Sequence, residues 1–183
     1  MDIIEKNKKL EIHRVAVAAR DIQCAKEGFE AIYKFDSEPA DNLYQTLLFG
    51  AVISYCRPFM SSEGLGRSSK RWNRFESDID KKYHEILLNY RNNVVAHSDI
   101  DNNKLYIYPT GMILTVGEHS IELDEPMFGV TTPLLNKSDM EFFINLCSTQ
   151  CSRMYNFLIP EIESRFRGKG LTPAPIRFNH EEI

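Results

Sequence analysis

Apolar residues recur at helical spacing in several stretches of the chain and predict that most of it is helical. The first helix is expected from about Leu10 to Tyr33, a stretch that contains five alanines and no proline. A second helix is expected to begin near Pro39, because proline suits a first helical turn, and to end before Pro58. Apolar residues fall on most of its sides, which predicts a largely buried helix.

A third helix is predicted to start between Lys70 and Asp78 and to extend to about His97. One face of it carries an apolar stripe at helical spacing, formed by Ile79, Tyr83, Ile86, Leu87, Tyr90 and Val94. The fourth helix is expected to begin at Ser138, which is placed to form a capping box with Glu141. Pro160 is expected to kink or end that helix.

Between the third and fourth helices the apolar pattern changes to short alternating runs. Pro109-Thr110-Gly111 and Gly117 interrupt these runs, which predicts a small antiparallel hairpin or three-stranded meander at about residues 104–124. The expected fold is therefore mainly α: a four-helix bundle with a β insertion between the third and fourth helices. Residues 1–168 would form one domain, and residues 169–183 an exposed tail.

Composition narrows the possible classes of protein. A chain of 183 residues fits one ordinary domain, and its net charge of −4 means that any nucleic-acid surface must be local. The longest apolar run, from Leu47 to Ile53, is too short for a membrane span, so no membrane partner is expected. The first residues lack a signal-peptide core, which favours a cytoplasmic protein. The four cysteines form no CxxC pair and are expected to be reduced and buried.

The segment from His84 to Asp99 carries the most informative motif. Within it, Arg91 is followed by Asn92, and five residues separate Arg91 from His97. The string Arg-Asn-x-x-x-Ala-His-Ser-Asp, at the end of a long third helix, resembles the signature of the HEPN superfamily, which comprises small helical bundles of toxins, antiphage systems and CRISPR ribonucleases. The upstream segment Tyr55-Cys-Arg-Pro-Phe59 also resembles bacterial HEPN-like proteins.

The resemblance implies metal-independent RNA cleavage without a cofactor. The ribose 2′-hydroxyl would attack the adjacent phosphate, leaving a 2′,3′-cyclic phosphate. On this interpretation His97 is the acid/base, because histidine exchanges protons near neutral pH, and Arg91 stabilises charge on the phosphate oxygens. Asn92 would orient Arg91, His97 or the phosphate, and His84 and Asp99 would have supporting roles. Since HEPN ribonucleases usually combine two motifs and this chain has one, the resemblance implies a homodimer.

Helix geometry leaves a second interpretation of these residues open. On an ideal helix Arg91 and His97 lie about 120° apart and about 9 Å along the axis, so they do not share a face. His97 falls on the apolar stripe, and Arg91 shares another face with His84. His97 would then be a core or helix-end histidine, Arg91 a surface residue that forms a salt bridge, and His84 a polar contact to neighbouring carboxylates. The 13-residue spacing of His84 and His97 matches no standard helical metal site, so no metal is expected.

A basic stretch precedes the third helix and contains one acidic residue, Glu63. Basic residues interleaved with aromatic ones suit single-stranded RNA, through phosphate pairing and base stacking. The alternative is a solvated loop anchored by its tryptophan, with Arg57-Pro58-Phe59 ending the second helix against the core. The candidate RNA-binding residues are Arg57, Arg67, Lys70, Arg71, Trp72 and Arg74.

Two hypotheses of different class follow from the sequence. The first is a bacterial HEPN-like endoribonuclease of a toxin–antitoxin or antiphage defence system, which binds RNA as a homodimer and has an antitoxin or another defence protein as partner. The second is a catalytically inactive HEPN-like module for protein interaction or nucleotide sensing. A third possibility is a metal-dependent hydrolase, which predicts bound metal and an activity that chelators inhibit. Some HEPN toxins carry a regulatory tyrosine two residues after the histidine; Asp99 stands there, so that form of regulation is not supported.

Overall fold

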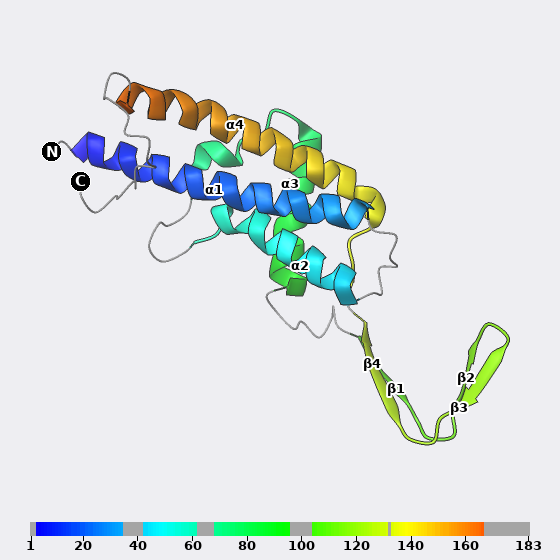
Figure 1. Ribbon diagram of the computed structural model, residues 1–183. Coiled ribbons are helices and arrows are strands. Elements are labelled where there is room, and N and C mark those ends of the chain that lie inside the picture. The colour runs from blue at the N-terminus through cyan, green and yellow to red at the C-terminus, as the bar shows by residue number, and fades with distance from the viewer. Residues whose placement is uncertain (1–2, 35–41, 62–67, 96–103, 132, 167–183) are drawn as a thin grey trace.

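The structure is a computed structural model that describes residues 3–34, 42–61, 68–95, 104–131 and 133–166. Its elements are mainly helical, and Figure 1 shows a bundle of helices with a β arm that projects from one end. The long helices are α1 (Ile3–Lys34), α2 (Asn42–Cys56), α3 (Asp78–Tyr90) and α4 (Met140–Phe166). The expected mainly α fold with four helices and a small antiparallel insertion is confirmed at this level.

Helices α1 and α4 lie side by side and run in opposite directions (Figure 1). At one end of the pair, the Tyr33 hydroxyl donates to Oε1 of Glu141 over 2.6 Å. At the other end, Nζ of Lys8 lies 2.8 Å from Oε2 of Glu161. Between these contacts the helices bury small and large apolar side chains together, and the rings of Phe29 and Phe143 are 5.2 Å apart. The α1–α4 pair therefore forms the centre of the core, and α2 packs against α1 beside this pair.

Helix α3 begins where a serine satisfies its first amide groups. The Ser77 Oγ accepts from the backbone N–H groups of Ile79 and Asp80, which is a conventional N-cap. The predicted apolar stripe is buried at Tyr83, Leu87 and Tyr90 and half-buried at Ile86 and Val94, whereas Ile79 is exposed. The α-helix changes at Arg91 into a π turn, η3 (Arg91–Val95), and the remainder of the segment to which the third helix was expected to extend lies outside the described residues.

The insertion is a bent two-stranded arm. Strand β1 (Lys104–Tyr108) pairs with β4 (Met127–Thr131), and β2 (Ile113–Val116) pairs with β3 (His119–Glu122), both antiparallel. At the bend, Gly111 has a φ of 79° and its N–H donates to the carbonyl of Leu123 over 2.8 Å. The insertion thus extends to Thr131 rather than ending near residue 124, and it has four strands in two ladders rather than one simple hairpin or meander.

Two local expectations, the capping box at the start of α4 and the burial of all four cysteines, were wrong. Before α4 the chain forms a 3-10 turn, η4 (Lys137–Asp139), whose N-cap is Asn136 rather than Ser138. The Glu141 carboxylate accepts from Tyr33 instead of closing a capping box. Pro160 does not end α4, which continues to Phe166, and Cys24 is exposed while the other three cysteines are buried. The expected tail at residues 169–183 lies outside the described residues, and none of the described helices is both long and apolar enough to cross a bilayer.

We predict opposite effects of two glycine-to-alanine substitutions on the free energy of unfolding. A Cβ on Gly28 of α1 would lie 2.9 Å from Cβ of Ala51 in α2, so Gly28→Ala should destabilise the protein by roughly 1–3 kcal/mol through overpacking. Gly50 of α2 has open space around its Cβ position, so Gly50→Ala should stabilise by up to about 1 kcal/mol. Urea denaturation of both variants measures this, and a neutral Gly28→Ala would mean that α1 and α2 are not in close contact there.

Candidate functional site

His84 lies in an aromatic cluster inside the bundle. It is 5% exposed, and a 2.8 Å hydrogen bond joins its Nδ1 to the hydroxyl of Tyr55 on α2. The rings of Phe59 and Phe75 lie 4.7 and 4.6 Å from the imidazole ring. A side chain enclosed in this way does not reach a substrate directly, so any supporting role of His84 is to hold α3 against α2.

The end of α2 also contacts the segment that leads to Arg91. The Cys56 thiol donates to the carbonyl of Leu87 over 3.5 Å, and the N–H of Arg91 donates to the same carbonyl. Burial raises the pKa of Cys56 to about 12, and the nearby positive charge of Arg91 opposes that effect only in part. Cys56 is therefore a neutral thiol near neutral pH, and it neither serves as a nucleophile nor pairs with Arg91 as a thiolate.

Arg91 and Asn92 form a contact at the point where α3 changes its geometry. Nη1 of Arg91 donates to Oδ1 of Asn92 over 3.1 Å, and both side chains are half-buried. They belong to the π turn η3, a conformation that is rare in proteins and frequent at functional sites. Because a π turn is wider than an α turn, the 120° separation expected between Arg91 and His97 on an ideal helix does not apply across this segment.

His97 and Asp99, the other half of the predicted site, lie outside the described residues. Among the described residues no cluster of three or more histidine, cysteine, aspartate or glutamate side chains is arranged to hold a metal ion. The part of the site that can be built from the structure therefore consists of Arg91, Asn92 and the cluster around His84.

Arg57 is held by a buried carboxylate. Asp21 on α1 is only 3% exposed, and its Oδ1 accepts from Nη1 of Arg57 over 3.3 Å and from Nη2 of Arg20 over 2.7 Å. The short 3-10 turn η1 (Arg57–Phe59) follows α2 directly and buries Pro58 and Phe59. The segment thus ends the second helix against the core, as one of the two sequence interpretations expected.

Trp72 anchors the basic stretch to the bundle and presents no open face for a nucleobase. It lies in the 3-10 turn η2 (Lys70–Asn73), it is 4% exposed, and its Nε1 donates to Oε1 of Glu11 over 3.3 Å. Arg71 also pairs with Glu11 at 3.2 Å, and its guanidinium lies over the rings of Trp72 and Phe157. The predicted stacking of Trp72 on RNA is therefore not supported, because packing in the core and a bond to Glu11 occupy the indole.

Lys70 and Arg74 are the members of the basic stretch that remain available for phosphate. Both side chains are exposed, and neither has an ion pair within the described part of the chain. Arg67 lies outside the described residues. Lys70 and Arg74 precede α3, whereas Arg91 follows it, so the structure brings the two sets of predicted residues to different ends of one helix rather than to one cluster.

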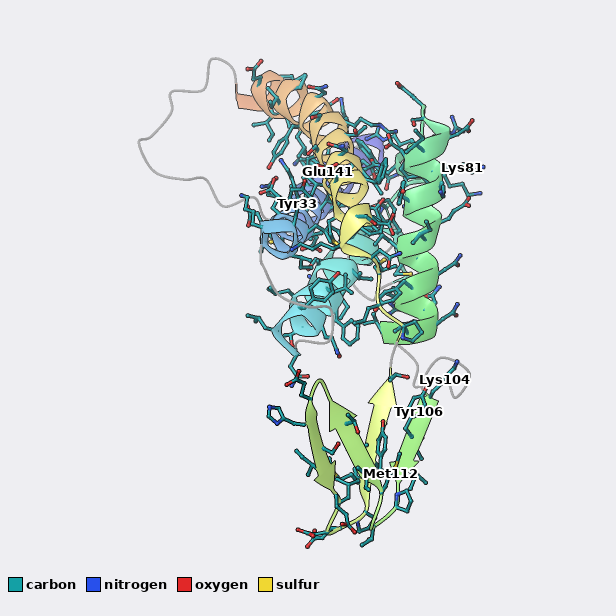
Figure 2. All side chains as sticks on the ribbon, turned by 90° about the vertical axis from the view of Figure 1, so that its right-hand side faces the viewer. Tyr33, Lys81, Lys104, Tyr106, Met112 and Glu141 are labelled. Atoms are coloured by element: carbon teal, nitrogen blue, oxygen red, sulfur yellow. The ribbon has the colours of Figure 1, made fainter. Side chains whose placement is uncertain are left out.

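Two tyrosines attach the β arm to the end of the bundle that carries Arg91. The Tyr90 hydroxyl donates to the carbonyl of Pro133 over 2.9 Å, and the Tyr44 hydroxyl donates to that of Leu135 over 2.9 Å. Tyr90 immediately precedes Arg91, so the chain leaving β4 is fastened beside the π turn. Figure 2 shows the same arrangement: Lys81 marks the far end of α3, and Lys104 marks the start of the arm near its other end.

Sequence reasoning missed Asp21 as a residue that organises this region. A signal for it was present, because Asp21 lies three residues after Ala18 and four before Ala25, on the buried face of α1. A carboxylate on such a face requires a partner, since an unpaired buried charge is costly. Arg57 provides that partner from the next helix end.

We expect the Tyr55 hydroxyl to stabilise the fold through His84. Tyr55→Phe should lower the free energy of unfolding by roughly 1–3 kcal/mol, because it leaves Nδ1 of a buried imidazole without that hydroxyl. Tyr155→Phe on α4 removes the same group from a side chain that is 45% exposed, and should change stability by less than about 0.5 kcal/mol. Equal melting temperatures for the two variants would show that the buried hydrogen bond contributes nothing.

Comparison with known proteins adds no relative. The chain matches no protein-family model, no curated protein and no solved structure. Its likeness to the HEPN superfamily consequently rests on the residues quoted above.

Proposed function

We propose that the chain is a HEPN-like, metal-independent endoribonuclease of a bacterial toxin or antiphage defence system, acting in the cytoplasm as a homodimer with an antitoxin or other defence protein as partner. The observation that carries the proposal is the contact between the two segments on which the resemblance rests. Tyr55 and Phe59 of the first segment enclose His84 of the second, and Cys56 contacts the carbonyl of Leu87 beside Arg91. Two motifs read separately along the sequence thus form one packed unit.

In this proposal, Arg91 stabilises the phosphate that is attacked. A guanidinium carries its charge at every physiological pH and donates in a planar fork that matches two phosphate oxygens. Half-burial near the end of α2 strengthens its field relative to that of a fully solvated arginine. Asn92 accepts from Nη1 of Arg91 and so fixes the direction in which the remaining donors point.

His97 supplies the proton transfers of the proposed reaction. The 2′-oxygen forms a bond to phosphorus as the bond from phosphorus to the 5′-oxygen breaks. A base removes the proton of the 2′-hydroxyl, and an acid protonates the departing 5′-oxygen. Two protomers, each with one His97, would supply one group for each transfer, which is the reason for a homodimer in the proposal.

One observation favours the second candidate function, an inactive module for protein interaction. The β arm exposes large apolar side chains on both of its ladders, and exposed apolar patches mark contact surfaces in many proteins. Nucleolytic and interaction functions differ in one measurement, namely whether the purified protein cleaves RNA in the presence of EDTA.

We expect cleavage that survives EDTA and leaves 2′,3′-cyclic phosphate ends. His97→Ala should abolish it while the melting temperature stays within a few degrees, and His119→Ala in the exposed strand β3 is the matched control. Arg91→Lys should remain inactive, because an ammonium lacks the planar fork, whereas Arg20→Lys should retain activity. A wild-type protein that cleaves neither structured nor unstructured RNA would contradict the ribonuclease proposal and favour the inactive interaction module.

A separate prediction concerns phosphate contact by the basic stretch. Replacing Lys70 and Arg74 by glutamate should weaken binding to single-stranded RNA and reduce the salt dependence of the affinity, by about 0.7 in log–log slope for each lost contact. Lys34→Glu with Lys104→Glu makes the same change in net charge elsewhere and should alter the slope less. Arg71→Glu should instead lower the melting temperature, since it removes the ion pair with Glu11. An unchanged affinity for Lys70→Glu/Arg74→Glu across a salt titration would assign the stretch to an ordinary solvated loop.

A further inference from the structure

One face of the β1–β4 ladder is entirely apolar and open to solvent. Residues directly opposite each other in an antiparallel pair point to the same face, and the register places Leu105 opposite Val130 and Ile107 opposite Phe128. Since positions 105 and 107 alternate with 106, these four side chains share one face. Leu105 and Val130 are 61% and 57% exposed, and Ile107 and Phe128 are 70% and 76% exposed.

This face cannot be explained by the stability of the arm itself. A two-stranded hairpin is marginally stable in water, and a sheet normally gains its stability by burying one face. None of the described helices covers the ladder, and Figure 1 shows the arm extending away from the bundle. Leu123, at the bend, is buried. The apolar face of the β1–β4 ladder is therefore expected to be buried against another molecule.

The charges around the face argue against RNA or an anionic membrane as its cover. Between residues 104 and 131 the arm carries one basic residue, Lys104, against four acidic ones, which are Glu118, Glu122, Asp124 and Glu125. Phosphate backbones and anionic lipids require basic surroundings. An uncharged apolar face on an acidic arm instead suits a second apolar protein surface.

We propose that the arm is a homodimerisation device in which this face, formed by Leu105, Ile107, Phe128 and Val130, stacks on the same face of a second copy. Such a contact is isologous: one apolar patch is complementary to itself about a two-fold axis. An aromatic side chain presents roughly 150–250 Å² when fully exposed, so four partly exposed residues of this kind present at most about 500 Å² on one copy. With complete burial, two copies would bury at most about 1,000 Å² in total, which is the lower limit of a specific interface.

The position of the arm connects this dimer to the candidate site. The arm leaves the bundle at the end where α3 passes into the π turn, and the bond from Tyr90 to the carbonyl of Pro133 fastens its return strand beside Arg91. If the two-fold axis runs along the strands, the stacked arms place the corresponding bundle ends of both copies on the same side of the dimer. The dimer stands on the surface of the arm alone; only its meaning for catalysis rests on the proposed function.

The test is the oligomeric state of the full chain at micromolar concentration, measured by light scattering and by sedimentation. The wild type should have twice the mass of one chain, and Ile107→Asp with Phe128→Asp should raise the dimer dissociation constant by about 100-fold or more, because a carboxylate is costly to bury in an apolar contact. The matched control is Tyr106→Asp with Met127→Asp, which changes the opposite face of the same ladder and should leave the dimer intact.

The comparison requires that the helical bundle is folded to the same extent in both double variants. Both double variants should give the same helical circular-dichroism spectrum at room temperature, because the bundle's core cluster contains no residue of the arm. A monomeric wild type would overturn the proposal and assign the face to a different protein. A dimer that survives Ile107→Asp/Phe128→Asp, or one that the control disrupts equally, would overturn it as well. Loss of the dimer supports the proposal whether or not the protein cleaves RNA, whereas absent cleavage by an intact dimer counts against the ribonuclease function alone.

Discussion

The hydrogen bond between Tyr55 and His84 is the constraint that fixes the second half of the bundle. It joins α2 to α3 inside a cluster of aromatic rings, where both side chains are buried and a lost hydrogen bond is costly. A buried bond in that position restricts the rotation of α3 about its axis, because turning the helix would separate the two groups. Arg91 lies seven residues further on, within about 20° of two full helical turns, so the rotation that buries His84 also directs Arg91 toward the end of α2.

Much of this arrangement could be predicted from the sequence, because helical periodicity reports directly which faces are buried. The stripe through Tyr83, Leu87 and Tyr90 is such a case, and it lies in the core. The burial of His84 could not be predicted in this way, because a polar residue next to an apolar stripe looks like a surface residue until its hydrogen-bond partner is known. The partner, Tyr55, is 29 residues away and on another helix.

Three features depend on information that local patterns do not contain. The full extent of the arm is hidden because its outer strand, from Met127 to Thr131, alternates large apolar residues with glycine and threonine and is exposed, so periodicity does not separate it from a loop. The π turn at Arg91 adds one residue to a turn, which no propensity marks. The burial of Trp72 depends on Glu11 from α1, about sixty residues earlier in the chain. The aromatic content of the basic stretch therefore suggested a nucleobase contact where a structural anchor exists.

The pairing of α1 with α4 has a consequence for synthesis of the protein. The apolar face of α1 ends at Lys34, and its main partner does not begin until Met140. At ribosomal rates of about 5–20 residues per second, α4 follows after roughly 5–20 s. During that interval α2 and α3 have emerged, but the layer that closes over Phe29 and Ala19 is absent. The nascent chain thus reaches its folded core only when its last helix is made, and a product terminated before α4 lacks the buried residues from Met140 to Leu158 that close the core over α1.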